Sequence, residues 1–308
     1  MDVITAKKKK RKSKRDRQYW KLYLFLLPAI AYVATWSYGP MYGIIIAFQD
    51  YKIKKGYWGS DWVGLKHFIR FVTYPDFWEM IKNTLGITLY SLALFPIAII
   101  FALLLNELKN VKFKKVVQMI TYMPHFLSTV VLCSLVVIFV GREGLIGQFY
   151  GWIKGTEGEN LLSIGKFFPD IYVWSATWAG LGWSSIIYVS ALSSISPELI
   201  EAARIDGAGR LQVIRHVNIP GILPTISLSF IMAAGGLLSV GFEKIYLLQS
   251  PLNLDYSNVV ATYSYNIGIV SGQYSYSTAI GLFQNVVNIL IMLLVNKITK
   301  KLSGTGMF

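Results

Sequence analysis

The chain has 308 residues, of which 54% are hydrophobic and 15% are charged, with a mean hydropathy of +0.48 and a formal net charge of +14. This composition is too apolar for an ordinary soluble domain, and the length allows about six membrane spans of about 20 residues each. Much of the positive charge lies between Lys7 and Arg15, directly before an apolar run, where a cytoplasmic leaflet attracts it, so we expect no nucleic-acid binding.

Six apolar runs of spanning length follow one another along the chain. They cover Tyr23–Phe48, Thr84–Leu105, Val117–Val140, Tyr172–Leu192, Ile222–Val240 and Thr278–Val295. In lipid only helices and closed barrels satisfy the backbone, and the runs show no alternation of polar and apolar residues. The first run is too long for a signal peptide and no small-residue cleavage site follows it. We therefore expect an all-α membrane protein with six transmembrane helices.

The basic residues of the loops predict the orientation of these helices. The N-terminal segment, Asn106–Lys115 and Asn296–Lys301 are basic, and they alternate correctly for two cytoplasmic termini. The long loop Gln49–Asn83 also carries lysines, but it carries acids as well, so its weight is smaller. We expect a basic cytoplasmic tail at residues 1–18, a transmembrane domain at 19–299 and a short cytoplasmic tail at 300–308.

The sequence lacks the patterns that accompany catalysis or metal binding. There is no GxxxxGK[ST] loop, no HExxH, no GxSxG and no Cys/His cluster. His67, His125 and His216 are far apart, and each is expected to make a local hydrogen bond. Cys133 is the single cysteine and is expected to be buried. We therefore expect no catalytic residue, no metal and no cofactor bound by this chain, and ion-driven carriage is disfavoured because the spans hold few ionisable residues.

A polar segment at residues 196–224 separates the fourth and fifth runs, on the expected cytoplasmic side. Ser196 and Pro197 are typical of a helix start, and Gly207 is typical of a helix stop. A second short helix is expected at Arg210–Val217, before Pro220 leads into the fifth run. The segment is therefore either an ordinary connector or a helical knob that docks a partner.

The spacing within this segment resembles the EAA loop of binding-protein-dependent ABC importer permeases. Glu201-Ala202-Ala203 is followed after three residues by Gly207, and after nine more by Val217-x-Ile219-Pro220. The family pattern is EAA–x3–G–x9–I–x–L–P, from which Val217 and Ile219 depart conservatively. Asp206-Gly207-Ala208 matches the DGA form of sugar permeases.

Two further stretches are similar to carbohydrate permeases. Trp62–Leu85 reads "WVGLKHFIRFVTYPDFWEMIKNTL" and resembles an external loop in which W-x-G-L-x-N-F recurs, with His67 where the family usually has Asn. "GPMYGIIIAFQDYK", after the long basic N-terminus, is similar to the LplB-like permeases, which import complex oligosaccharides.

The resemblance implies a type I ABC importer permease fold in the cell membrane. It implies a second permease subunit, expected to be a different chain, two cytoplasmic ATPase subunits that bind ATP and Mg, and an extracellular solute-binding protein. The EAA loop would couple this chain to the ATPase. The residues implied in coupling are Glu201, Ala202, Ala203, Asp206, Gly207, Val217, Ile219 and Pro220.

A carbohydrate pathway would be lined by aromatic and hydrogen-bonding side chains within the spans. The candidates are Tyr122, Trp178, Trp183, Tyr188, Gln284, Asn285 and Asn288. For each of the last three, packing between helices is the favoured role. Binding-protein docking is expected at the loops Gln49–Asn83 and Glu243–Ser277. The alternatives are an ABC permease for a non-sugar solute, a secondary transporter and a membrane-embedded enzyme.

Overall fold

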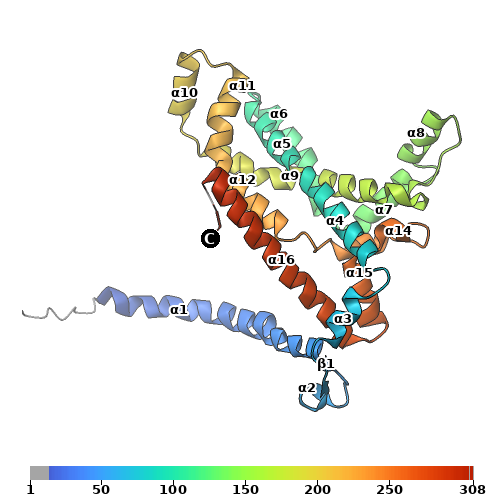
Figure 1. The fold of residues 1–308 in the computed structure, drawn as a ribbon. Coiled ribbons are helices and arrows are strands. Elements are labelled where there is room, and N and C mark those ends of the chain that lie inside the picture. Colours follow the sequence, from blue (N-terminus) through green and yellow to red (C-terminus); the bar gives the residue numbers. More distant parts are fainter. Residues whose placement is uncertain (1–13, 305, 308) are drawn as a thin grey trace, which may run out of the picture.

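The computed structural model describes residues 14–304, 306 and 307, so most of the basic segment expected at residues 1–18 lies outside the described chain. The described residues fold into helices and one small two-stranded ribbon (Figure 1). In the ribbon, β1 (Gln49–Asp50) pairs antiparallel with β2 (Asp61–Trp62), and Gln49 lies opposite Trp62.

Five helical stretches of the described chain are long and apolar enough to cross a membrane. They are Tyr23–Phe48, Phe77–Glu107, Thr129–Lys154, Arg210–Ala234 and Tyr274–Lys301. A sixth is reached if Gly165–Ser193 and Pro197–Ile205, which are bent by 72° at a short break, count together as one span. The expected all-α membrane fold is therefore confirmed, with five to six candidate spans.

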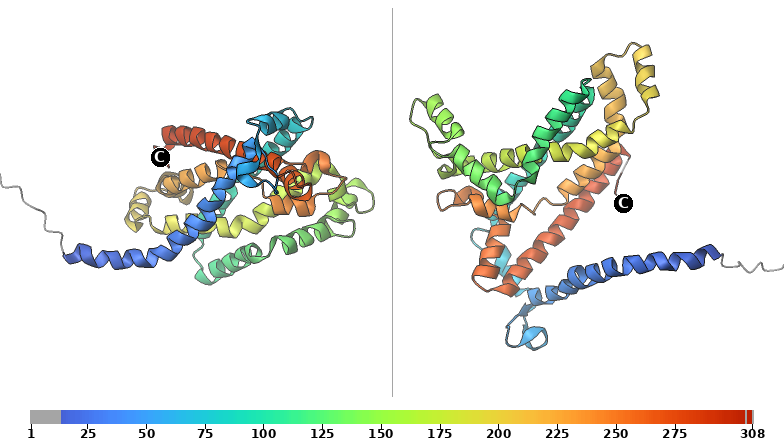
Figure 2. Two further views of the ribbon diagram at one scale, coloured as in Figure 1. Left: turned by 90° about the horizontal axis from the view of Figure 1, so that it is seen from below. Right: turned by 180° about the vertical axis from the view of Figure 1, so that it is seen from behind.

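The first span changes its helix type along its length. It consists of α1 (Lys14–Val33), a π-helical turn (Ala34–Tyr38) and a 3-10 helix (Gly39–Phe48). Pro40 lies at the last change, where it cannot donate to an α-helical ladder. Figure 1 and the right-hand view of Figure 2 show α1 extending away from the other helices, and none of the most apolar 18-residue window of this span is buried.

The third run, Val117–Val140, is not the single helix that we expected. Its parts are α6 (Val111–Tyr122), a 3-10 turn (Met123–Phe126) and α7 (Thr129–Val140). Pro124 lacks an N–H and ends the first helix. Ser128 then starts the next one, because its hydroxyl accepts the N–H of Val131 at 3.3 Å. α8 (Leu145–Lys154) follows after a short turn.

The fifth run also differs from expectation at both ends. Instead of a separate helix at Arg210–Val217, one continuous helix runs through three parts, which are α11 (Arg210–Val213), a π-helical turn (Ile214–Asn218) and α12 (Ile219–Ala234). Residues 235–241 are unwound rather than helical. There the N–H of Leu238 donates to Asn288 Oδ1 at 2.8 Å and its carbonyl accepts from Gln284 Nε2 at 3.0 Å, so side chains replace the helical ladder.

The other elements complete the bundle. They are α2 (Gly56–Gly59), α3 (Lys66–Val72), α4 (Phe77–Ala93), α5 (Pro96–Glu107), α9 (Phe168–Ser193), α10 (Pro197–Ile205), α13 (Phe242–Leu248), α14 (Leu254–Ser257), α15 (Val260–Tyr265) and α16 (Tyr274–Ser303), with 3-10 turns at Leu161–Ser163 and Gly165–Phe167 and a π-helical turn at Asn266–Val270.

The buried residues form three clusters. One joins α7, α9 and α13, another α3, α4, α15 and α16, and a third α5, α9 and α12. α9 takes part in two of them and lies at the centre of the bundle.

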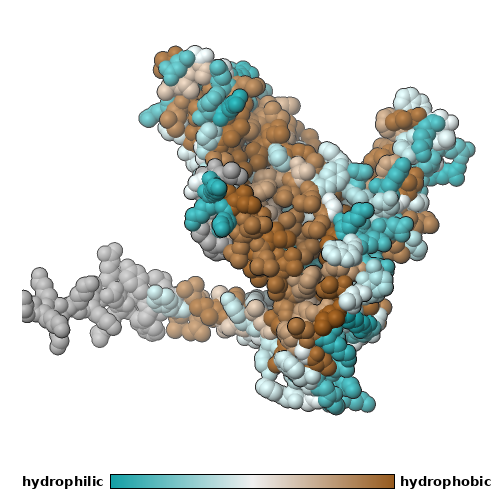
Figure 3. All heavy atoms as spheres, viewed as in Figure 1, coloured by the Kyte–Doolittle hydropathy of each residue, from teal (hydrophilic) through white to brown (hydrophobic). Residues whose placement is uncertain are grey.

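The face of the bundle seen in Figure 3 is apolar over most of its height and polar near both ends. Large exposed apolar side chains include Ile100, Leu104, Met232, Ile289 and Leu290, all from helices of candidate spans. A surface of this kind is stable in lipid but would be unusual for a monomer in water.

Candidate functional site

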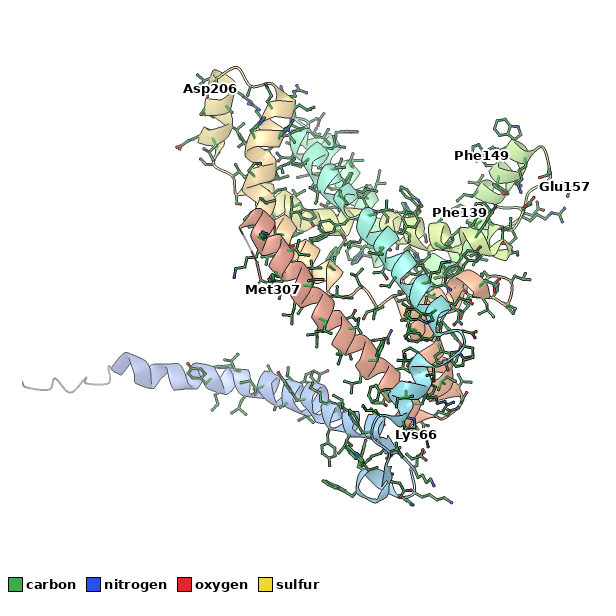
Figure 4. All side chains as sticks on the ribbon, in the orientation of Figure 1. Lys66, Phe139, Phe149, Glu157, Asp206 and Met307 are labelled. Atoms are coloured by element: carbon green, nitrogen blue, oxygen red, sulfur yellow. The ribbon has the colours of Figure 1, made fainter. Side chains whose placement is uncertain are left out.

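The EAA loop (residues 196–224) forms a helical hairpin at one end of the molecule. α10 starts at Pro197, directly after Ser196, but the Ser196 side chain makes no capping hydrogen bond, contrary to the expectation of an N-cap side chain. Figure 4 shows Asp206 at the tip of the hairpin, at the opposite end of the molecule from Lys66. The EAA loop and the loop Gln49–Asn83, which contains Lys66, therefore lie at opposite ends of the molecule.

The turn of the hairpin depends on Gly207. Its φ of 82° lies in the left-handed region, where a side chain is strained. The turn is closed by the N–H of Ala208, which donates to the Ala203 carbonyl at 2.9 Å, and by the N–H of Gly207, which donates to the Arg204 carbonyl at 3.1 Å. The helix stop predicted at this glycine is present.

The surface of the hairpin is left uncovered by the rest of the described chain. α10 has no buried residue, and Glu201, Ala202 and Asp206 are exposed. Leu199, Ile205 and Leu211 are 58%, 86% and 82% exposed. Within the described chain no acid of the loop forms an ion pair. Exposed apolar residues beside unpaired acids are typical of a surface that binds another protein.

Of the residues in the second half of the EAA pattern, Val217 lies beside the first half, whereas Ile219 and Pro220 do not line the same pocket. Val217 lines a small pocket of about 290 Å³ together with Ala203, Asp206 and Gly207. Ile219 and Pro220 are instead the first residues of α12. The pattern therefore specifies both a turn and the helix by which that turn continues into a span.

An aromatic cluster lies where α9 crosses the break between α6 and α7. The Trp183 and His125 rings are parallel, with centroids 4.4 Å apart and planes 7° apart. Phe126 meets the indole edge-on at 5.9 Å. Because His125 and Phe126 belong to the turn that Pro124 starts, the break in the third run places both rings against α9.

The same crossing requires Gly182. A Cβ atom on Gly182 would overlap the Thr121 carbonyl and lie 2.6 Å from the Tyr122 ring, so the two helices touch through backbone. Tyr122 also accepts a hydrogen bond from Gln118 Nε2 at 3.2 Å. The structure thus brings two candidates for the pathway, Tyr122 and Trp183, to one place.

Two other aromatic candidates face elsewhere. Trp178 lines an apolar groove of about 390 Å³ between α7 and α9, together with Trp174. Tyr188 is 2% exposed and packs edge-on against Phe95, beside a separate pocket of about 440 Å³ that Ser184 also lines. The segment "TWAGLGWSS" therefore does not form one aromatic site.

The polar candidates of α16 divide in the same way. Gln284 and Asn288 hold the unwound segment through the two bonds to Leu238, and Asn288 Nδ2 also donates to Ser239 Oγ at 2.9 Å. Asn285 is exposed. Gln284 and Asn288 therefore make the packing contacts between helices that the sequence indicated for them.

The two loops expected to dock a binding protein, Gln49–Asn83 and Glu243–Ser277, form one layer, which we call the outer layer. Arg70 donates to Gln273 Oε1 at 2.9 Å and lies 4.1 Å from the centroid of the Tyr276 ring. Asn83 Nδ2 donates to the Asp255 carbonyl at 2.9 Å. Contacts between residues about 170 to 200 apart in sequence therefore join the loops into a single surface.

The histidines only partly follow the expectation of local hydrogen bonds. His67 Nε2 lies 3.1 Å from the Gln49 carbonyl oxygen, and His216 Nδ1 lies 3.0 Å from the Gln212 carbonyl oxygen. His125 stacks on Trp183 instead. In the described chain, no group of three or more His, Cys, Asp or Glu residues is placed to hold a metal ion.

Two residues with notable contacts, His125 and Lys244, were not among the candidates from the sequence. His125 had one recognisable feature in the sequence, its position directly after Pro124 inside an apolar run. Lys244 had no such feature. It is buried, its Nζ donates to the Tyr172 carbonyl at 2.7 Å, and burial lowers its pKa to about 8. Cys133 is buried beside it, as expected, with Sγ 4.0 Å from the Lys244 carbonyl oxygen.

The chain is similar to membrane components of transport systems. A model of the family described as "Binding-protein-dependent transport system inner membrane component" matches residues 94–304. The polygalacturonan/rhamnogalacturonan transport system permease protein YteP of Bacillus subtilis (strain 168) is 41% identical over 100% of this chain and 97% of its own length. Protein LplB of the same organism is 39% identical over 96% of this chain and 92% of its own length.

A solved structure has the same fold. It is a chain of a bacterial alginate ABC transporter in complex with an alginate pentasaccharide-bound periplasmic protein. The TM-score is 0.85 with 36% sequence identity, and the similarity covers 95% of this chain and 98% of the other.

Proposed function

Since this chain belongs to the family of binding-protein-dependent transport system inner membrane components, we propose that it is the transmembrane permease subunit of an ATP-driven ABC importer for a carbohydrate, specifically an oligosaccharide. Relatives named for polygalacturonan, rhamnogalacturonan and alginate support the class of solute. The chain itself is not an enzyme in this proposal, because ATP and Mg bind to a separate ATPase.

The EAA loop is the site of energy input. Its exposed Leu199 and Ile205 pack in a groove of the cytoplasmic ATPase, and Glu201 and Asp206 meet basic groups there. The turn at Gly207 keeps the hairpin compact enough to enter a groove. One observation supports this assignment above the others: α10 buries no residue within its own subunit.

The movement of the loop is transmitted through a continuous helix. α11, the π-helical turn and α12 form one span from Arg210 to Ala234, so displacement of the loop moves the whole span. Its far end is tied to α16 through Leu238, which bonds to Gln284 and Asn288. Closure of the ATPase pair therefore shifts two spans together, which is a rigid-body mode of allosteric coupling.

The sugar passes beside the cluster of Trp183, His125 and Tyr122. Sugars bind through aromatic faces and oriented hydrogen-bonding groups, and this cluster offers both within the spans. Trp183 is 48% exposed in the isolated subunit, so its ring remains available to a ligand. Trp178 and Tyr188 face other pockets and are assigned no contact with sugar here.

The assembly completes the pathway. A second permease subunit lies across from this one, two ATPase subunits dock on the cytoplasmic side, and an extracellular binding protein delivers the sugar to the layer formed by Gln49–Asn83 and Glu243–Ser277. The periplasmic protein bound in the alginate transporter supports the last of these. Both termini of this chain are cytoplasmic in the proposal.

Reconstitution of the complex in vesicles tests the function. The complex is purified from its native membrane through a tag on this chain, its subunits are identified, and uptake of labelled oligosaccharides is followed with and without ATP. We expect a copurified ATPase and ATP-dependent uptake that requires the binding protein. Uptake driven by an ion gradient without an ATPase would point to a secondary transporter instead, and uptake of a non-sugar solute alone would overturn the class of solute.

A further inference from the structure

A pocket of about 610 Å³ lies where the connection between α5 and α6 meets the EAA loop. One wall is formed by Asn106–Lys109 and the other by Arg204, Gly207–Arg210 and Asn218. It is a different pocket from the small one beside Val217, although both share Gly207. Nothing in the proposed transport mechanism uses it.

The walls carry three cations that form no ion pair within the described residues. Lys109, Arg204 and Arg210 are exposed, and in the described part of the chain none of them has a carboxylate within 4 Å. One acid, Glu107, is half-buried on the same wall as Lys109. The pocket therefore offers several positive charges and one negative charge to a ligand.

Asn218 is the second observation that points to a ligand. This residue lines the pocket and is 2% exposed, yet its Oδ1 atom accepts no hydrogen bond from any described residue. A buried amide oxygen without a donor is costly, because it loses the hydrogen bonds that water would supply. A ligand that donates an N–H or O–H at this point would remove that cost.

The position of the pocket relative to the ends of the candidate spans indicates the kind of ligand. Glu107 ends one candidate span and Arg210 begins another, both on the side of the EAA loop. This is the level at which the hydrocarbon core gives way to lipid headgroups, and basic pockets between spans are suited to bind them.

We propose that this pocket binds the headgroup of a phospholipid that carries a hydrogen donor beside its phosphate. The phosphate lies among Lys109, Arg204 and Arg210, while the ammonium of ethanolamine or a hydroxyl of glycerol reaches Asn218 Oδ1 and Glu107. A choline headgroup has the same charge as ethanolamine but no donor, so it fits the phosphate and leaves Asn218 unpaired. The bound lipid braces the EAA loop against the α5–α6 connection.

The test compares headgroups in the whole complex. The complex is placed in nanodiscs of phosphatidylcholine, phosphatidylethanolamine or phosphatidylglycerol, and retained lipid is counted by native mass spectrometry. We expect retention of the ethanolamine lipid to exceed that of the choline lipid, which has the same net charge, by about two- to tenfold, the worth of one or two net hydrogen bonds. Retention of the glycerol lipid, which is anionic, should also exceed that of the choline lipid. Asn218→Leu should lower the preference for ethanolamine over choline, and Arg210→Gln should lower retention of all three lipids.

Matched variants and competitors keep the test decisive. Arg215→Gln changes an exposed arginine that does not line the pocket, and its lipid retention should equal that of the parent chain. If Asn218→Leu does not assemble, the inference is tested by comparing lipid retention among the three headgroups in the parent chain and in Arg210→Gln. Equal retention of all headgroups would overturn the inference, as would displacement by inorganic phosphate or exclusion of lipid whenever the ATPase is bound.

The inference rests on the proposed placement of the EAA loop on the cytoplasmic side of the spans, but not on the identity of the sugar. Loss of lipid preference with normal sugar uptake contradicts this inference alone. Absence of ATP-dependent uptake with normal lipid preference contradicts the proposed function alone.

Discussion

The indole of Trp183 and the imidazole of His125 are stacked, with planes 7° apart and centroids 4.4 Å apart. One ring belongs to the central helix α9 and the other to the turn that interrupts the third apolar run. The stack therefore links the two spans at the point where helical geometry is already broken by Pro124, and it leaves nearly half of the indole exposed.

We expect Trp183→Ala to lower uptake of oligosaccharide by about 5- to 30-fold, the effect of losing about 1–2 kcal/mol. The reason is loss of an aromatic surface within the pathway, since the residue is too exposed for its truncation to unfold the subunit. The measurement is initial uptake rate in vesicles, with assembly checked on gels. Trp178→Ala, on the other side of α9, is the control and should retain most uptake. An equal loss in both variants would argue against this position of the pathway.

Gly207→Asp is expected to leave the complex in the membrane but to abolish or uncouple import. A side chain at a φ of 82° costs about 1–2 kcal/mol and changes the tip of the EAA loop. Gly209→Ala provides the matched control, because Gly209 has a φ of −72° and its added Cβ would meet only Gln212 Oε1, at 3.6 Å. Sugar uptake and ATP hydrolysis are measured on both variants. Normal uptake by Gly207→Asp would refute the docking role.

Gly182→Ala is expected to destabilise the subunit by about 1–3 kcal/mol, because the added methyl group overlaps the backbone of Thr121. Gly180→Ala adds the same methyl group on the same helix, where the nearest atom is Ser184 Oγ at 3.9 Å, and should change stability little. Thermal unfolding in detergent compares the two. Similar melting temperatures would mean that the α6–α9 crossing is less tight than the structure indicates.

Asn288→Ala is expected to cost about 1–3 kcal/mol, because it leaves the buried N–H of Leu238 without an acceptor. Asn285→Ala changes an exposed side chain three residues earlier and should lie within about 0.5 kcal/mol of the parent chain. Unfolding and uptake are followed together. If Asn285 lines the pathway, its variant loses uptake at an unchanged melting temperature, whereas a lowered melting temperature would place it in a packing role.

The outer layer is expected to loosen in acid because of His67. Burial lowers the pKa of His67 below its ordinary value of about 6.5, and Lys66 and Arg70 add to this effect while Asp50 and the bond to the Gln49 carbonyl oppose it. The neutral form keeps Nδ1 without a partner, and protonation would bury an unpaired N–H there.

The sign of the effect follows from linkage. The folded pKa lies below the unfolded one, so the stabilising contribution is present above about pH 6.5 and is lost as the pH falls through the folded pKa. The protection factors of the amides in residues 49–73, which correct for the slower intrinsic exchange in acid, should therefore fall as the pH is lowered in the parent chain. His67→Asn, which restores the residue usual in the resembled loop, should remove that fall in protection. Equal acid sensitivity in both would exclude His67 as its cause.

The spans and the EAA loop are predictable from sequence because their signals are local. Apolar length marks each span, and the left-handed turn at Gly207 follows from the only residue type that adopts it freely. The break at residues 123–128 also has a local cause in Pro124, but it was not expected because the run was judged by its apolar residues alone. The unwound segment after Ala234 has no such signal, because its backbone bonds to Gln284 and Asn288, about 50 residues further along the chain.

The pathway was the least predictable part for the same reason. Trp178 and Trp183 are five residues apart, which on a helix turns them to different faces, and only the packing of α6 and α7 decides which face meets which neighbour. Tyr122 lies at the α6–α9 crossing, but its place in the pathway stays a prediction. His125 could not be found from the sequence, because its stacking partner Trp183 is nearly 60 residues away.

The exposed apolar side chains of the EAA loop have a consequence for how the protein is made. Leu199, Ile205 and Leu211 face outward on a hairpin that buries nothing of α10, and surfaces of this kind promote aggregation when they are left open to water. If the proposed ATPase covers this surface, a cell that makes this chain in excess over the ATPase would accumulate subunits that aggregate. In the proposed complex, synthesis of this chain would therefore have to be matched to that of the ATPase.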